Sequence, residues 1–151
     1  MSILSAEDRN RLIVAATEAK EFSYSPYSRF RVGAALLSTD GKIIKGANIE
    51  NASYGGAICA ERTAIVKAAS EGIRSFVGLA VTSDVASSIA PCGICRQVLR
   101  EFCALDMPVL LVPADYPQPG AEGDGGILDT TLEGLLPHSF GPEHLELPRQ
   151  S

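Results

Sequence analysis

Three cysteines in this sequence have the spacing of a catalytic metal site. Cys92 and Cys95 form a C-x-x-C pair, and Cys59 precedes them in the chain. The pair and Cys59 each fall in the first turn of a predicted helix, so two helix N-termini can bring the three thiols together. Zinc with three protein ligands keeps its fourth position open for water, as in catalytic rather than structural sites. The spacing therefore predicts a catalytic zinc site.

Two charged residues that follow Cys59 could serve this metal. Glu61 lies two residues further on, and at a helix N-terminus its side chain can still turn toward an ion beyond the end of the axis. A carboxylate there could take a proton from metal-bound water and pass it to a substrate. Arg62, one helical turn after Cys59, could donate hydrogen bonds to sulfur and make that water more acidic.

The same residues also permit two interpretations without catalysis at a metal. A C-x-x-C pair alone is also typical of thioredoxin-like redox proteins. A structural zinc site would need a fourth ligand, for which Cys103, His138 and His144 are available. We expect Cys103 in the core, because it falls late in its helix on the apolar stripe, and we expect both histidines in a solvated tail. A redox protein and a non-catalytic zinc protein remain alternatives.

Composition indicates one domain of ordinary type. The chain has 151 residues, 46% hydrophobic and 21% charged, which suffices for a core without disulfides or metal. A formal net charge of -5 disfavours a polynucleotide substrate. The sequence shows neither a secretory signal nor an apolar run of membrane-spanning length. We expect one cytoplasmic domain over residues 1–151, with no nucleic-acid or membrane partner.

Hydrophobic spacing predicts alternating helices and strands. Apolar residues recur at helical spacing in three stretches, and short apolar runs between turn residues indicate strands and a hairpin. This order is typical of an α/β domain, in which helices cover a mixed sheet whose later strands are parallel through right-handed crossovers. The predicted segments are helices at 5–22, 57–70 and 91–103, a hairpin at 30–44, strands at 76–82 and 109–112, and a surface loop at 113–126.

The motifs Cys59-Ala60-Glu61 and Pro91-Cys92-Gly93-Ile94-Cys95-Arg96-Gln97 together resemble those of the zinc cytidine deaminase family. The first motif has Cys where polynucleotide-editing members carry His, as in the small members that act on free nucleosides. The resemblance covers approximately residues 6–145. It implies a three-layer α/β/α fold, with a mixed sheet of roughly five strands and helices on both faces. It also implies one zinc ion per subunit, held by the three cysteines, with Glu61 as the proton carrier.

The resemblance extends to residues that would contact a nucleoside. Asn48 and Glu50 are two apart, so on an extended segment they project from one face and could bind a ribose hydroxyl. From the residues alone, Phe30 would be a core side chain, and Asn48 and Glu50 a polar strand end. The substrate-binding residues implied by the resemblance are Phe30, Asn48, Glu50, Tyr54, Ala60, Ala90 and Phe140.

The implied assembly is a homotetramer with shared active sites. Phe140 matches a phenylalanine that reaches a neighbouring subunit's pocket and stacks on the pyrimidine, and Tyr27 and Tyr54 match positions near subunit contacts. The implied reaction is hydrolytic deamination of cytidine and deoxycytidine to the uridines plus ammonia, as in pyrimidine salvage. The alternative within this chemistry is a deaminase of an aminoacyl-nucleoside antibiotic of the blasticidin type, which shares the three cysteines and the glutamate.

Overall fold

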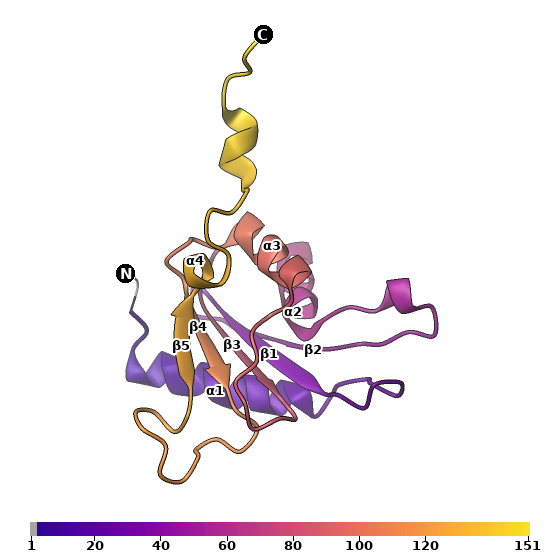
Figure 1. Cartoon of the computed structure of the whole chain (residues 1–151), viewed down its shortest axis with the longest axis vertical. Helices are drawn as coiled ribbons and strands as arrows, with labels where there is room; N and C mark the ends of the chain where they lie inside the picture. The colour runs from indigo at the N-terminus through magenta and orange to yellow at the C-terminus, as the bar shows by residue number, and fades with distance from the viewer. Residues whose placement is uncertain (1–2) are drawn as a thin grey trace.

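A five-stranded mixed sheet forms the centre of the molecule (Figure 1). The computed structural model describes residues 3–151. The strand order is β2-β1-β3-β4-β5, in which β3 and β4 are parallel and every other neighbouring pair is antiparallel. The strands are β1 (Val32–Ser38), β2 (Ile43–Ala47), β3 (Phe76–Ser83), β4 (Pro108–Val112) and β5 (Leu128–Thr131). The helices are α1 (Ala6–Lys20), α2 (Ala60–Ser70), α3 (Gly93–Phe102) and α4 (Leu132–Leu135), with 3-10 turns η1 (Tyr54–Gly56) and η2 (Pro142–Glu146).

Helices cover both faces of this sheet. Because side chains alternate between the faces of a strand, Ala35 and Leu37 of β1 pack against α1, whereas Ala34 and Leu36 pack on the side of α2 and α3. Figure 1 shows α1 on one side of the sheet and α2 and α3 on the other side. The expected three-layer α/β/α arrangement is therefore confirmed. Within residues 3–151, no helix is both long and apolar enough to cross a membrane.

Close packing fixes the start of α2 against the sheet. A Cβ at Gly46 of β2 would lie 2.5 Å from the carbonyl oxygen of Ala60 and 2.5 Å from the amide nitrogen of Ala64. A glycine therefore lets β2 contact the backbone of the first turn of α2 directly. This contact positions the residue immediately before the helix, Cys59.

The two cysteine-bearing helices begin later than predicted, at residues 60 and 93 rather than 57 and 91. Ile49 and Ile58 exchange two backbone hydrogen bonds, of 3.0 and 2.9 Å, and these hold the chain extended up to Cys59. Cys59 and Cys92 are consequently the N-cap residues of α2 and α3, whereas only Cys95 lies in a first turn. The prediction that all three lie in first turns was wrong by one position for two of them.

Three short elements near the C-terminus, β5, α4 and η2, were not predicted. β5 lacks a clear alternation of apolar and polar residues and forms because it pairs with β4. α4 follows directly, capped by the Thr131 hydroxyl, which accepts a hydrogen bond of 3.1 Å from the Gly134 amide. The predicted loop before β5 is confirmed, and Arg9 of α1 pairs with Asp124 of this loop and Asp129 of β5. Beyond α4, the chain extends away from the sheet (Figure 1).

Candidate active site

The thiols of Cys59, Cys92 and Cys95 converge where α2 and α3 begin. Their sulfur atoms all lie within 4.8 Å of one another, and the Sγ atoms of Cys59 and Cys92 are 3.8 Å apart. Zinc–sulfur bonds of about 2.3 Å in tetrahedral geometry separate two sulfurs by about 3.8 Å. Cys95 is buried, Cys59 is half-buried and Cys92 is exposed, so the cluster has one open side. The donor set therefore fits a zinc ion with three protein ligands.

Electrostatics at the cluster also favour a cation. Burial and the nearby carboxylate of Glu61 raise the pKa of the Cys95 thiol. Burial opposes ionisation of Cys92 as well, but backbone and side-chain hydrogen bonds from Cys95 and the thiol of Cys59 lower the pKa of Cys92 overall. A bound divalent cation deprotonates a coordinating thiol. The buried Cys95 can therefore act as a thiolate when a metal supplies the balancing charge.

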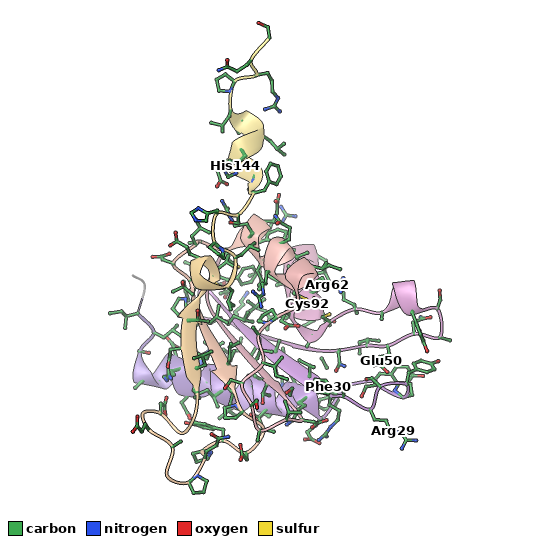
Figure 2. All side chains as sticks on the ribbon, in the orientation of Figure 1. Arg29, Phe30, Glu50, Arg62, Cys92 and His144 are labelled. Carbon is green, nitrogen blue, oxygen red and sulfur yellow. The ribbon has the colours of Figure 1, made fainter. Side chains whose placement is uncertain are left out.

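Arg62 lies beside the sulfur atoms, as the sequence predicted. Its Nη2 donates to Cys59 Sγ over 3.4 Å, and this hydrogen bond raises the pKa of the guanidinium above its already high value. Its Nε is buried without a hydrogen-bond partner among the described residues. Figure 2 places Arg62 and Cys92 at the same end of the two helices. A permanent positive charge here would offset the negative charge of cysteines that bind a metal as thiolates.

Glu61 is buried next to the same cluster, with only 5% of its surface exposed. Its Oε2 accepts a hydrogen bond from the Cys95 thiol over 3.8 Å. Burial raises the pKa of this carboxyl group. A carboxyl group that is held at a fixed position can both accept and return a proton, and a raised pKa makes its protonated form easier to reach.

A cavity of about 180 Å³ opens beside these groups. Phe30 and Asn48 line one side of it, so Phe30 is a half-buried wall residue rather than a core residue. The Asn48 amide is fixed, because its Nδ2 donates to the Phe30 carbonyl over 2.8 Å and its Oδ1 accepts from the Val32 amide over 2.9 Å. The cavity is lined by Phe30, Val32, Asn48, Cys59, Ala60, Glu61, Val81, Ser83, Ile89, Ala90 and Cys92.

Comparison with known proteins places this geometry in a family. The family model for the cytidine and deoxycytidylate deaminase zinc-binding region matches residues 6–111, which contain the whole cysteine cluster. The chain belongs to the cytidine deaminase family. A cytidine deaminase of Halalkalibacterium halodurans is 49% identical over 138 residues, which cover 91% of this chain and 98% of the relative. A probable cytidine deaminase of Dictyostelium discoideum is 41% identical over 94% of this chain and 90% of the relative.

Solved cytidine deaminase structures have the same fold. The crystal structure of the cytidine deaminase from Burkholderia pseudomallei matches with a TM-score of 0.77 and 42% identity, and the match covers 91% of this chain and all of that one. The cytidine deaminase of Mycobacterium tuberculosis matches with a TM-score of 0.71 and 38% identity over 89% of this chain and 98% of that one. The fold that the sequence motifs implied is thus the fold of the family.

Glu50 and Tyr54, which the family resemblance also nominated, do not line the 180 Å³ cavity, but they border a hollow of about 380 Å³ together with Cys59 and Arg62. They also border a hollow of about 350 Å³, where the ring of Tyr54 makes an edge contact with Tyr27 at 6.0 Å between centroids. Glu50 accepts hydrogen bonds from the amides of Tyr27 and Ser28 over 2.9 and 3.1 Å, and the Ser28 hydroxyl lowers the pKa of Glu50. Contact of Glu50 and Tyr54 with a substrate stays a prediction.

Phe140 lies outside the active-site cavity of its own chain. Its side chain is 57% exposed in the extended C-terminal segment, where it stacks on His144 with 5.6 Å between ring centroids. Figure 2 shows His144 far out in this segment, away from Cys92. Among the described residues, the cluster of candidate metal ligands consists of the three cysteines and includes none of Cys103, His138 and His144, so none of these is placed as a fourth ligand.

The sequence interpretation missed two sets of contacts around the site. Asp84, at the end of β3, accepts hydrogen bonds from the backbone amide and the guanidinium of Arg31, next to Phe30. Arg96 and Arg100 of α3 bind the C-terminal segment from Leu135 onward. No pattern in the sequence indicates these contacts, because their partners lie about 40 to 50 residues away.

Proposed function

We propose that this chain catalyses the hydrolytic deamination of cytidine and deoxycytidine to uridine and deoxyuridine, with release of ammonia. The observation that carries the proposal is the buried Glu61 carboxyl, which shares one cavity with the cysteine cluster at the starts of α2 and α3. This is the arrangement that a zinc-dependent nucleoside deaminase needs: a metal site with one open side and a proton carrier beside it.

Cys59, Cys92 and Cys95 hold one zinc ion per chain. When bound, zinc in such a site lowers the pKa of a water molecule at its fourth position and so supplies a nucleophile. The protein offsets the charge of the three thiolates with the N-termini of α2 and α3, each equivalent to roughly half a positive charge, and with Arg62. The separation of 3.8 Å between the sulfur atoms of Cys59 and Cys92 supports this ligand set.

Glu61 carries the protons of the reaction. It removes a proton from the attacking water and delivers it to N3 of the pyrimidine ring, while the oxygen bonds to C4. It then transfers the second proton of the water to the amino nitrogen, and the C4–N bond breaks to release ammonia. The burial that raises the pKa of Glu61 supports this role, because it lets the carboxyl group hold the proton between the two steps.

The remaining wall of the cavity binds the nucleoside. Phe30 packs against the nucleoside, and the backbone N–H of Ala60 and the carbonyl of Ala90 bind the edge of the base. Asn48 and Glu50 bind a ribose hydroxyl, with Tyr54 nearby. The position of Phe30, Asn48, Ala60 and Ala90 around one cavity supports the first part of this assignment.

Phe140 completes the site of a neighbouring chain in a homotetramer, where its ring stacks on the pyrimidine. Its exposure, outside the cavity of its own chain, supports a role in another chain. The enzyme acts in pyrimidine salvage in the cytoplasm. Its four unpaired cysteines support a reducing compartment.

The test is to measure zinc content and cytidine deamination on the same purified sample. We expect about one zinc per chain and a decrease in ultraviolet absorbance as cytidine is converted to uridine. Full zinc content without turnover of cytidine or deoxycytidine would mean that the substrate is another heterocycle with an amino group. Blasticidin-type nucleosides would then be tested first. Folded protein that binds no zinc would contradict the metal assignment and favour a thiol redox protein.

A further inference from the structure

The C-terminal segment that carries Phe140 is bound to the metal-ligand helix, α3. Two α3 side chains donate hydrogen bonds to its backbone: Arg96 Nη1 to the carbonyl of Leu135 over 2.5 Å, and Gln97 Nε2 to the carbonyl of Phe140 over 2.9 Å. The helix that carries Cys92 and Cys95 at its start therefore also binds the backbone of the C-terminal segment.

Arg100 lies one helical turn after Arg96 on α3, and it binds the C-terminal segment on both sides of Phe140. Its Nε donates to the Ser139 hydroxyl over 2.8 Å, and its Nη2 binds the carboxylate of Glu143. Only 8% of the Arg100 side chain is exposed, so this charge depends on its partners. A Cβ at Gly141 would lie 2.3 Å from the Arg100 guanidinium carbon, so the segment packs directly against this group.

Contacts within the segment order the Phe140 ring as well. The Gly141 amide donates to Nδ1 of His144 over 2.9 Å, and the imidazole stacks on the Phe140 ring at an interplanar angle of 22°. The ring is thus held in one direction while it is still largely exposed. A side chain that is ordered before it binds loses less conformational entropy on binding.

We propose that Arg100 and Glu143 form a positioning pair, which fixes the direction of Phe140 so that its ring enters the neighbouring chain's active site preorganised. The inference rests on the proposed function, since it takes Phe140 as the residue that stacks on the pyrimidine. It assigns a role in substrate binding to two residues that do not themselves reach the cavity.

The charge-reversing variant Glu143→Lys tests the pair. Glu143 is itself exposed, so the substitution leaves the core intact while it opposes the buried guanidinium. We expect the KM for cytidine to rise about threefold to tenfold, with kcat within about twofold, as ordering of the segment is lost. Glu143→Gln keeps a hydrogen-bond acceptor, so its KM should lie between that of the wild type and that of Glu143→Lys. The matched control is Glu146→Lys, because it makes the same charge change at an exposed position of η2.

A double-mutant cycle with Phe140→Ala separates positioning from general stability. If the pair acts through Phe140, Glu143→Lys adds nothing to the KM of the Phe140→Ala enzyme. An equal rise in KM in both backgrounds would overturn the proposal. An unchanged KM in Glu143→Lys, or in Phe140→Ala itself, would also overturn it.

Backbone amide hydrogen exchange provides a readout without activity. We expect faster exchange at residues 138–146 in Glu143→Lys than in Glu146→Lys, with exchange in α2 unchanged and the oligomer intact by light scattering. If the wild type failed to deaminate cytidine while the segment loosened as expected, the proposed function would fail and the pair would stand as the anchor of the segment. If the wild type were active and exchange were unchanged in Glu143→Lys, a positioning role for the Arg100–Glu143 pair would be excluded.

Discussion

The cysteine cluster and Phe140 differ in how much of their surroundings their own chain supplies. Cys95 and Glu61 are buried between α2, α3 and the sheet, and all the predicted metal ligands come from one chain. Phe140 projects from the C-terminal segment, and only its backbone carbonyl is bound by α3. One chain thus brings all three proposed metal ligands together, but it leaves the proposed stacking partner of the substrate outside its own cavity.

The two regions also differ in what holds them together. The cluster depends on where α2 and α3 begin, and the start of α2 is fixed by packing against β2 and by the extended residues before it. The C-terminal segment depends on polar contacts of α3 with residues about 40 positions further along the chain. Damage to the cluster should therefore abolish the chemistry, whereas damage to the segment should weaken substrate binding.

The largest effect is expected from Cys92→Ala. Mutation of a residue that only hydrogen-bonds to a zinc ligand lowers metal affinity by about 10- to 100-fold. Loss of a ligand itself should therefore lower zinc affinity by at least about 100-fold and abolish measurable turnover. Elemental analysis after gel filtration measures the zinc. Cys103→Ala is the matched control, since Cys103 is buried away from the cluster, and it should keep its zinc. Normal zinc content in Cys92→Ala would remove Cys92 from the ligand set.

Glu61→Gln should separate metal binding from proton transfer. The amide has the shape of the carboxyl group but cannot act as an acid or a base, so we expect kcat to fall by about 10²- to 10⁴-fold with zinc unchanged. Glu71→Gln, at the exposed C-cap of the same helix, serves as the control and should retain activity. The proton-carrier assignment fails if Glu61→Gln deaminates cytidine at a substantial rate.

Phe140→Ala should affect binding rather than chemistry. Loss of a ring that stacks on a base should raise the KM for cytidine about tenfold, while the zinc content stays the same. Phe22→Ala removes another exposed ring and is expected to leave KM unchanged. A fall in kcat with constant KM would place Phe140 in the chemical step and would remove the contrast between the two regions.

The smallest effect is expected at Asp84, which holds Arg31 beside Phe30. The hydrogen bond from Arg31 lowers the pKa of Asp84 below its ordinary value of 3.8, so its ionised form stabilises the fold above that pH, and the contribution is lost as the pH falls. Asp84→Asn should lower Tm at pH 7 by about 2–4 °C, and the difference should shrink as the pH falls below about 4. Asp106→Asn, at an exposed turn, is the comparison; an equal shift there would leave no specific role for Asp84.

The sequence was most informative where chemistry and local structure coincide. The spacing of Cys59, Cys92 and Cys95 predicted a cluster that the structure brings within 4.8 Å, and the one-turn separation of Arg62 from Cys59 predicted their hydrogen bond. Strand and helix patterns predicted the sheet and its layers, because apolar periodicity is a local signal. The extended residues before α2 were not predicted, since Ile49 and Ile58 pair only in the folded chain.

Contacts between distant segments could not be predicted from local patterns. Arg100 is an ordinary helical residue in the sequence, and its burial arises only when Ser139 and Glu143 fold over it. β5 likewise forms because β4 offers it a partner. The position of Phe140 follows from such contacts, so the role proposed for it comes from the family resemblance and not from any local pattern in the sequence.

Co-expression of Glu61→Gln and Phe140→Ala chains tests most directly whether one chain forms the metal site and two form the substrate site. In mixed oligomers, a site with Glu61 from the Phe140→Ala chain can receive Phe140 from the Glu61→Gln chain. The account predicts cytidine turnover with the KM of the wild type, which neither variant shows alone. Mixed oligomers that show only the raised KM of Phe140→Ala would contradict it.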